Sequence, residues 1–379
     1  MMNRQGLARE SDAEDLGHLI HAARLHFEEG LGQVEIAARM QVSQSTVSRW
    51  LTRAAAEGFV VTSIRPPSLP SLEYQVRRSL EPEFRSVRVL PPGPGKNLET
   101  LGDAGAELLL DAIQSVQDRR SEDDTRVCPA VRITFSSGET LRVLVERFVT
   151  RLRLDDVARR RIGRTVIELY PAALYWSEEL HAHYPGTLVT TLWTEAQSLF
   201  APGRVRAFAP VLPRLYYDKE LWRPENRNLA DQALELSGAR RILDCAAQAD
   251  IFVLAIGTLD EPTYPTILNT LGLDVGQIDG CNGDSAEFVY VPLREGALKR
   301  TVEERLVRVG LPDFARAAHD SNRWVIGIAG GKKKVRAMCE VLSASPPVLN
   351  ALVTDSSVAE GWLQERAAQA HRAASASRR

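Results

Sequence analysis

Hydrophobic and polar positions divide the chain into an all-helical beginning and a longer part in which strands alternate with helices. In the beginning, apolar residues recur at helical spacing in three segments, which are residues 12–29, 33–40 and 44–57. Asp12 and Ser43 are suitable N-caps for the first and third helices, and Gly58 can end the third as the residue after its C-cap. The β-branched run over residues 59–64 predicts a small β wing.

A proline-rich break over residues 65–70 separates this beginning from the rest. A short helix over residues 72–80 and a strand over residues 87–90 are predicted to follow it. Further apolar runs predict strands over residues 130–135, 166–169, 205–208, 251–256, 324–329 and 351–353. Helical patterns lie near residues 98–116, 140–152, 229–248, 333–342 and 356–369. This alternation predicts a mostly parallel α/β sheet with helices on both faces.

These boundaries predict four regions of the chain. We expect a helical head over residues 1–65, a linker with its short helix over residues 66–85, an α/β domain over residues 86–369 and a disordered tail over residues 370–379. The tail is assigned as disordered because it is a terminal stretch of alanine, serine and arginine.

Composition narrows the class of protein. The 379 residues are 44% hydrophobic and 25% charged, which excludes wholesale disorder and fibrous repeats. The net charge is −2, so binding to nucleic acid requires a locally basic patch. No apolar run reaches the roughly 20 residues that cross a bilayer, and Met1–Ser11 lacks the apolar stretch of a signal peptide. We therefore expect a cytoplasmic protein with no membrane partner.

Cysteine and histidine spacing gives no reason to expect a metal or any other cofactor. The four cysteines, Cys128, Cys245, Cys281 and Cys339, stand far apart and form no C-x-x-C pair, so we expect free thiols. His181 and His183 form an H-x-H pair without a third ligand at a recognisable spacing. We interpret that pair as exposed polar residues.

The strongest motif covers residues 33–51, where two short helices are spaced as in a helix-turn-helix. Such helices cross steeply, and Ala37 supplies the small residue that the crossing requires. Apolar side chains occupy the packing positions, which are Ile36, Val42, Val47 and Leu51. Gln41 takes the turn position often held by glycine, where a left-handed backbone costs about 1 kcal/mol. A generic three-helix bundle is the alternative interpretation.

The outer face of the second helix is polar, as contact with base edges and phosphates requires. We predict that DNA is bound by Ser43, Gln44, Ser45, Thr46, Ser48, Arg49 and Arg53. Between residues 39 and 65, four arginines stand against one acid, Glu57, so the local charge is about +3. The motif therefore predicts a double-stranded DNA operator as a partner.

Three glycine-containing turns lie where a predicted strand ends. The first, Ser137–Thr140, opens a helix, and the main-chain N–H groups there form an anion seat to which the two hydroxyls can add donors. In the second, Gly257 ends a buried strand and lets the backbone approach a ligand. In the third, Gly330 and Gly331 precede Lys332–Lys334, which either neutralise an anion or form a solvated charge run. Turns at the carboxyl ends of parallel strands converge at one edge of a sheet.

With these pieces in place, the chain resembles the SorC family of sugar-binding transcriptional regulators, of the SorC/DeoR type. The resemblance rests on Ile36-Ala37, Val42-Ser43, Thr46–Leu51, Gly138-x-Thr140-Leu141, Asp250…Gly257, Gly283-Asp284, Gly330-Gly331-x-x-Lys334 and Leu352–Asp355. It implies an effector domain similar to the ribose-5-phosphate isomerase and glucosamine-6-phosphate deaminase group, a sugar or sugar-phosphate effector, and a dimer or tetramer. Over residues 168–184 the chain is rich in aromatic and acidic residues and departs from the family pattern.

The resemblance also implies roles for single residues. Gly138, Glu139 and Thr140 would hold a phosphate, Asp284 would bind sugar hydroxyls, and Lys334 would face the anionic or carbonyl end of the ligand. These roles are chemically consistent, because a carboxylate accepts from vicinal hydroxyls while an ammonium and loop amides donate to phosphate.

Three functional hypotheses follow. The leading one is a one-component transcriptional regulator, not an enzyme, whose operator affinity changes when a sugar or sugar phosphate binds. The second is a sugar-phosphate isomerase or deaminase with an appended DNA-binding head, in which Glu139 or Asp284 would be the base. The third is a constitutive DNA-binding oligomer whose second domain is only a scaffold. The sequence leaves open whether the outcome is repression or activation.

Overall fold

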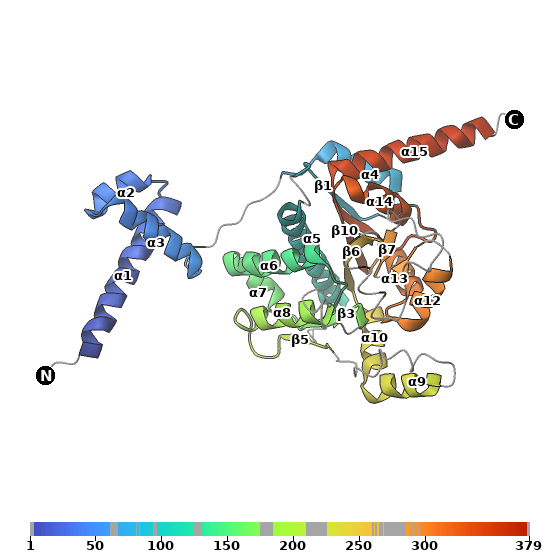
Figure 1. Ribbon diagram of the computed structural model, residues 1–379, viewed down its shortest axis with the longest axis horizontal. Helices are drawn as coiled ribbons and strands as arrows, with labels where there is room; N and C mark the ends of the chain where they lie inside the picture. The colour runs from blue at the N-terminus through green and yellow to red at the C-terminus, as the bar shows by residue number, and fades with distance from the viewer. Residues whose placement is uncertain are drawn as a thin grey trace. The chain divides into compact units, whose positions relative to one another are not determined.

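The computed structural model describes residues 4–60, 67–80, 82, 84–93, 97–123, 130–174, 185–209, 226–259, 261, 264, 268, 286–289, 291–293 and 296–376. The chain divides into two compact units, Met1–Ile64 and Arg65–Arg379, which we call the head and the body (Figure 1). Among the described residues, none of the helices combines the length and the apolar character that crossing a membrane requires.

The head consists of three helices, α1 (Arg4–Phe27), α2 (Gln33–Met40) and α3 (Gln44–Ala56). They form because their apolar faces close over one core, in which Leu19, Ile36 and Val47 are fully buried. The predicted positions of all three helices are confirmed. Asp12 is not an N-cap, however, because the helix-favouring residues before it extend α1 back to Arg4. The predicted wing falls largely on residues 61–66, which lie outside the described residues.

The ends of α3 are set by the two residues that the sequence indicates. The Ser43 hydroxyl accepts a hydrogen bond from the Thr46 N–H at 3.1 Å, which caps the beginning. Gly58 has a φ of +77°, a left-handed conformation that suits glycine. With this turn, the N–H groups of Gly58 and Phe59 donate to the carbonyls of Ala55 and Ala54. α3 is therefore closed at both ends by local contacts.

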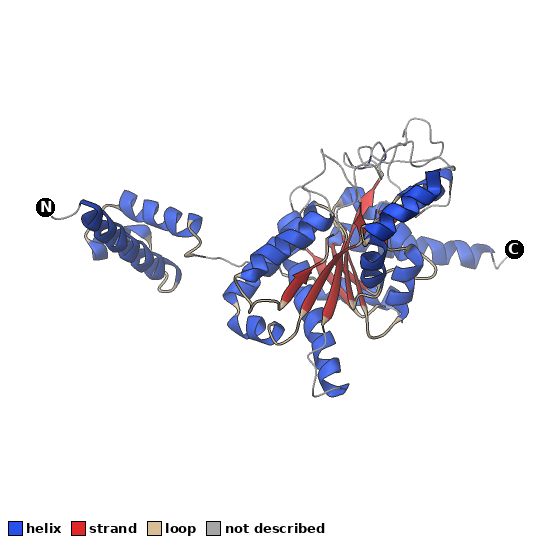
Figure 2. Cartoon of the chain, turned by 90° about the horizontal axis from the view of Figure 1, so that it is seen from below, coloured by secondary structure: helices blue, strands red, loops and turns tan. Residues whose placement is uncertain are grey.

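The body is built on a mostly parallel sheet with the strand order β1-β11-β10-β6-β2-β3-β5 (Figures 1 and 2). These strands are β1 (Ser86–Leu90), β11 (Ala351–Asp355), β10 (Trp324–Ile328), β6 (Ile251–Thr258), β2 (Val131–Phe135), β3 (Ile167–Pro171) and β5 (Val205–Ala207). Antiparallel β7 (Ala286–Phe288) extends from β6 and pairs with β8 (Val291–Pro292). A separate two-stranded sheet joins β4 (Ala173–Leu174) and β9 (Val307–Arg308). The predicted α/β fold class is confirmed.

Helices cover both faces of this sheet, as its continuously buried central strands require (Figure 2). One core lies under α5 (Leu98–Asp123), α6 (Glu139–Leu154), α7 (Asp156–Ile162) and α8 (Pro185–Gln197). The other lies under α4 (Pro70–Leu80), α9 (Arg227–Leu236), α10 (Ala239–Ala247), α12 (Ala297–Arg305), α13 (Leu311–His319), α14 (Val335–Leu342) and α15 (Ser356–Ala376).

Three predicted helices of the body end differently from expectation. The helix predicted over residues 229–248 is divided into α9 and α10, because Gly238 adopts a left-handed φ of +70°. The helix predicted over residues 333–342 begins with a 3₁₀ turn at Lys332–Lys334. The helix predicted over residues 356–369 continues to Ala376 as α15, into the segment that the sequence predicts to be a tail.

Candidate functional site

The helix pair of the head has the geometry that the sequence motif predicts. A turn of three residues joins α2 to α3, and Gln41 adopts the left-handed conformation at φ 57° and ψ 40°. Ala37 is 7% exposed at the helix pair, and its carbonyl accepts from the Val42 N–H at 3.0 Å. The left-handed turn at Gln41 is therefore closed by a backbone hydrogen bond from Val42 to Ala37 in the last turns of α2.

The outer face of α3 carries the predicted DNA-binding residues in two groups. Ser43, Ser45 and Thr46 are linked to one another, because the Ser43 hydroxyl lies 2.8 Å from the Ser45 hydroxyl and 2.9 Å from that of Thr46. Gln44 and Arg49 are exposed, and the charge of Arg49 contributes to the lowered pKa of Asp15. The first group fixes the beginning of the helix, and the second can reach outward.

Thr52 is a residue of this face that the sequence analysis missed. It is exposed, follows Ser48 by one turn and donates its hydroxyl hydrogen bond to the Ser48 carbonyl at 2.9 Å. Ser48 itself is half-buried. The helical spacing from Gln44 through Ser48 to Thr52 would have indicated this position.

Arg53 differs from Arg49, because its guanidinium is engaged within the head. It donates to Asp15 and to Glu57, each at 2.6 Å. Asp15 also accepts from the indole N–H of Trp50 at 3.0 Å, and this bond is the main reason that the pKa of Asp15 lies below its usual value. The side chain of Arg53 thus ties α3 to α1 and is not an open donor.

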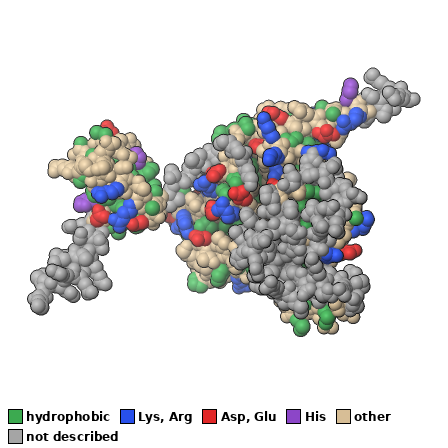
Figure 3. Space-filling view, in the orientation of Figure 1, with side chains coloured by type: hydrophobic (Ala, Val, Ile, Leu, Met, Phe, Trp, Pro, Cys, Tyr) green, Lys and Arg blue, Asp and Glu red, His purple; other side chains and the backbone are tan. Residues whose placement is uncertain are grey.

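The predicted local charge of about +3 is too high for the head as folded. Arg39 pairs with Glu29 at 3.1 Å, and Arg53 pairs with Asp15, an acid 38 positions earlier in the chain. Basic and acidic side chains accordingly lie side by side on the head (Figure 3). The segment 39–65 does not contain these two acids, of which Asp15 lies in α1 and Glu29 in the turn after it.

The second candidate site lies where β2, β6, β10 and β11 end, which we call the carboxyl edge. The N–H of Ala255 in β6 donates to the Ser136 hydroxyl at 3.0 Å, which joins the first glycine turn to β6. Gly138 has a φ of +129°, and a Cβ there would lie 3.2 Å from that of Ala255. Glycine is therefore required where Ser137–Thr140 passes β6 and opens α6.

The third turn lies against the same strand ends. Lys334 donates from its Nζ to the carbonyl of Ile256 at 2.8 Å and forms an ion pair with Glu261. The Gly331 N–H donates to the Oδ2 of Asp355 at 2.6 Å, and a Cβ on Gly330 would lie 2.9 Å from that oxygen. The third turn thus contacts β6 through Lys334 and β11 through Gly330 and Gly331.

Two further residues that the sequence predicts as ligand-binding are Gly257 and Asp284. Gly257 does not open a loop, because β6 continues to Thr258 and Gly257 pairs with Glu287 of β7. Asp284 lies outside the described residues.

Two carboxylates of the carboxyl edge, Asp355 and Glu261, were not among the predicted site residues. Asp355 directly follows an apolar strand pattern, a position that could have indicated it. Glu261 stands 73 positions from Lys334, and no local pattern joins the two.

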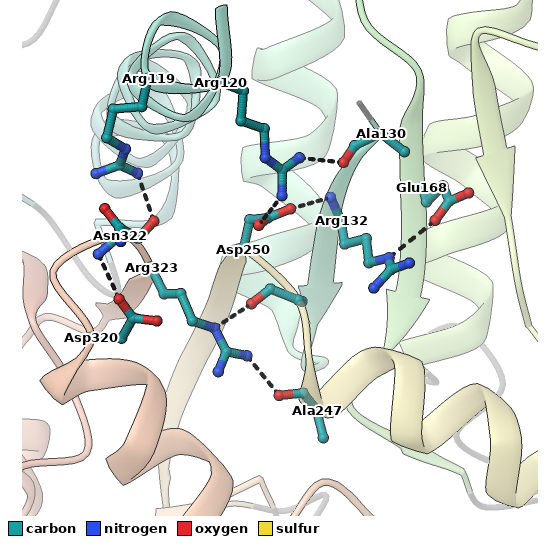
Figure 4. Close-up of polar contacts among 11 residues, drawn as sticks. Arg119, Arg120, Ala130, Arg132, Glu168, Ala247, Asp250, Asp320, Asn322 and Arg323 are labelled. Atoms are coloured by element: carbon teal, nitrogen blue, oxygen red, sulfur yellow. Dashed lines mark hydrogen bonds and ion pairs between the residues drawn. The ribbon is translucent and has the colours of Figure 1, made fainter. Parts of the chain in front are cut away.

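At the opposite ends of the same strands, charged side chains bind the loops together (Figure 4). We call this the amino edge, formed by the residues at the beginnings of β1, β2, β3, β6, β10 and β11. Asp250 accepts from the Arg120 guanidinium and from the backbone N–H of Arg132 at 2.9 Å. Arg132 in turn donates to Glu168 at 3.3 Å. These contacts link α5, β2, β3 and β6.

Main-chain carbonyls engage the remaining arginines of the amino edge. Arg323 donates to Ala249 at 2.8 Å and to Ala247 at 2.6 Å. Arg85 donates to the carbonyl of Arg323 at 2.9 Å and stacks on Trp324, 4.4 Å from the ring centre. Burial, followed by the charge of Arg119, lowers the pKa of Arg85. No group of side chains suited to a metal ion occurs in the described part of the chain.

Comparisons with known proteins give 48 similar chains of solved structures, which include transcriptional regulators and a deaminase. The full-length sorbitol operon regulator SorC from Klebsiella pneumoniae is 18% identical, with 92% of this chain and 98% of that chain covered and a TM-score of 0.47. A probable sor operon regulator from Shigella flexneri is 18% identical, with coverages of 78% and 98% and a TM-score of 0.48. A monomeric glucosamine-6-phosphate deaminase is 10% identical, with coverages of 73% and 99% and a TM-score of 0.35.

The match found by comparing sequences lies in the head. No curated protein matches the chain. The family model of the homeodomain-like domain matches residues 20–61, which contain the last third of α1 and all of α2 and α3. Together with the buried helix crossing and the capped α3, this match identifies residues 20–61 as a homeodomain-like helix-turn-helix domain.

Proposed function

We propose that this protein is a one-component transcriptional regulator in which the head binds a double-stranded DNA operator and the carboxyl edge of the body binds a sugar or sugar phosphate. The observation that carries the proposal is the outer face of α3, where Gln44 and Arg49 are exposed on a helix whose opposite face is buried in the head core. A polar helix face of this kind, held by a second crossing helix, fits the major groove.

Different residues at the outer face of α3 would contact the bases and the phosphates of DNA. Arg49 can donate two hydrogen bonds to a guanine, and Gln44 can pair with an adenine edge. The hydroxyl group of Ser43, fixed by its contacts with Ser45 and Thr46, places the beginning of α3 for contact with a phosphate. Arg53 would support DNA binding indirectly by holding α3 against α1, because its guanidinium is already paired with Asp15 and Glu57.

The ligand would act by shifting populations of the assembled protein. We propose a homodimer or tetramer in which ligand binding favours one arrangement of the bodies and thereby changes the spacing of paired heads on DNA. A tenfold change in operator affinity requires a coupling free energy of only about 1.4 kcal/mol, within the usual allosteric range.

The substitution Arg49→Ala tests the DNA-binding half of the proposal. A duplex selected by the protein from a random pool would be titrated with each variant at one fixed salt concentration. We expect R49A to weaken binding by about tenfold to a hundredfold, the usual effect of losing a bidentate base contact. Arg39→Ala is the matched control, because Arg39 is exposed but paired with Glu29, and it should change affinity far less. Equal affinity of R49A and the wild type would overturn the assignment.

A second experiment separates the regulator from the enzyme hypothesis. Purified protein would be incubated with ribose 5-phosphate and with glucosamine 6-phosphate, and products would be followed directly. The proposal expects binding of these compounds without turnover. Turnover of either compound would favour the isomerase or deaminase interpretation.

A further inference from the structure

Two carboxylates of the chain itself already occupy donors of the third glycine turn. Asp355 accepts from the Gly331 N–H at 2.6 Å and, through its other oxygen, from the Val358 N–H at 3.2 Å. Glu261 pairs with the Lys334 ammonium, whose other contact is the Ile256 carbonyl at 2.8 Å. A ligand that uses either donor must therefore take the place of an internal anion.

The two carboxylates differ in how easily they can leave. Asp355 is 2% exposed and belongs to β11 itself, so its movement would break the junction of β11 with α15. The Glu261 side chain is 38% exposed and contacts Lys334, which is 18% exposed. The backbone of Glu261 is held separately, since its N–H donates to Thr258 and its carbonyl accepts from Tyr264. The Glu261 carboxylate can thus rotate away while its turn stays in place.

We propose that Glu261 is the residue that selects the charge of the ligand at the carboxyl edge. It holds the anion position on Lys334, and a ligand with a phosphate or carboxylate group takes that position by exchange. This inference rests on the proposed function only in placing the ligand at this edge.

The selection follows from the charges before and after binding. An anionic ligand replaces one charge-assisted contact of Lys334 by another, so the ammonium is never left without a counter-ion. A neutral sugar offers the Lys334 ammonium no counter-ion, so it leaves the ion pair with Glu261 in place. Lys332 and Lys333, which are both exposed in the same turn, add to the preference for an anion.

Inorganic phosphate is the simplest probe of this exchange. The full chain would be titrated with phosphate by calorimetry at constant ionic strength, as wild type, Glu261→Gln, Lys334→Gln and the double variant. We expect E261Q to bind phosphate about tenfold more tightly than the wild type, because the competing anion is gone. In the K334Q background, the same change should have almost no effect, since its target ammonium is absent.

Matched controls keep the test specific to this ion pair. Glu195→Gln removes an acid that pairs with Arg153 at 2.7 Å between α6 and α8, and it should leave phosphate affinity unchanged. Ribose 5-phosphate and ribose form a second pair of probes, of which only the phosphorylated sugar should gain affinity from E261Q.

Three results would overturn the proposal. They are unchanged or weaker phosphate binding by E261Q, an equal gain in the K334Q background, and a gain for ribose as large as that for ribose 5-phosphate. Each of these would leave the DNA-binding function intact, because the R49A experiment measures a different unit of the chain. Conversely, tighter phosphate binding by E261Q would support the charge selection even if the head bound no operator.

Discussion

The two edges of the central sheet use their charged groups differently. At the amino edge, the guanidinium groups of Arg323 and Arg85 donate to main-chain carbonyls, and Asp250 joins Arg120 to the backbone of β2. At the carboxyl edge, glycine turns bring backbone N–H groups and Lys334 together, and the partners of these donors are side-chain carboxylates.

The difference concerns what a ligand would have to displace. A ligand at the amino edge would compete with carbonyl groups that cannot leave without unfolding a loop. A ligand at the carboxyl edge competes with the half-exposed Glu261 side chain, which can rotate away. Ligands bind at the carboxyl ends of parallel strands in α/β proteins generally, and here the exchangeable partner gives a physical reason for that position.

The largest effect should follow from Asn350→Ala at the amino edge. Asn350 is fully buried, donates to the carbonyls of Ala318 and Arg323 at 3.1 and 3.0 Å, and accepts from the Val325 N–H at 2.8 Å. Removing its amide leaves these groups unsatisfied, so we expect a loss of about 3 kcal/mol in unfolding free energy. Urea denaturation would measure it, with the exposed Asn322→Ala as control. A variant that binds ligand more tightly or more weakly, yet keeps the wild-type unfolding free energy, would contradict a structural role for the amino edge.

A smaller loss is expected from Asp250→Asn, which keeps the shape of the side chain. Asp250 is largely buried, with a side chain 15% exposed, and it bridges Arg120 and the N–H of Arg132. Loss of its charge should lower the unfolding free energy by about 2 kcal/mol, the range of hydrogen bonds to charged groups. The same urea titration should be repeated with saturating phosphate. Phosphate should then add as much to the unfolding free energy of this variant as to that of the wild type. A loss of phosphate binding would mean that the two edges are not independent.

Gly331→Ala tests the carboxyl edge at its backbone. Gly331 has a φ of +93°, and a Cβ there would meet no atom within 4 Å, so the penalty is purely conformational. We expect a loss of about 1 kcal/mol in unfolding free energy. Gly296→Ala is the matched control, because Gly296 lies in equally open space with extended backbone at φ 167°. Equal losses of unfolding free energy in the two variants would show that the backbone at Gly331 does not require glycine.

The smallest effect should follow from Arg119→Gln. Arg119 donates to the carbonyls of Ser321 and Asn322 at 3.1 and 2.6 Å, and its charge lowers the pKa of the neighbouring Arg85. Relief of that repulsion offsets the lost hydrogen bonds, so the unfolding free energy should change by only about 0.5 kcal/mol. Thermal unfolding followed by circular dichroism would measure the change. A loss as large as that of D250N would show that the repulsion is not relieved.

Regular patterns made most of the fold predictable from the sequence. The helix-turn-helix follows from the spacing of Ile36, Val47 and Leu51, and the sheet follows from apolar runs at the positions that β2, β6, β10 and β11 occupy. The helices α7, α8, α12 and α13 were not predicted. For α7 a local signal existed, because Asp155 caps it by accepting from the N–H groups of Val157 and Ala158.

The charge pairs of the candidate sites were not predictable in the same way. Arg53 finds Asp15, and Lys334 finds Glu261, through tertiary contacts that no window of the sequence contains. Periodicity indicates which face of an element is buried, but not which distant acid a given cation meets. For this reason the sequence indicates which turns lie at the strand ends, whereas the counter-ions of Arg53 and Lys334 required the structure.

The central claim is that a small molecule bound to the body changes the affinity of the head for DNA. Its most direct test is the Kd of the full chain for its selected duplex, measured by fluorescence anisotropy with and without a panel of sugars and their phosphates at constant ionic strength. The account predicts that at least one phosphorylated sugar changes this Kd by about tenfold or more, and that E261Q responds at a lower concentration of it. An identical Kd in the presence of every compound, for both proteins, would contradict the account.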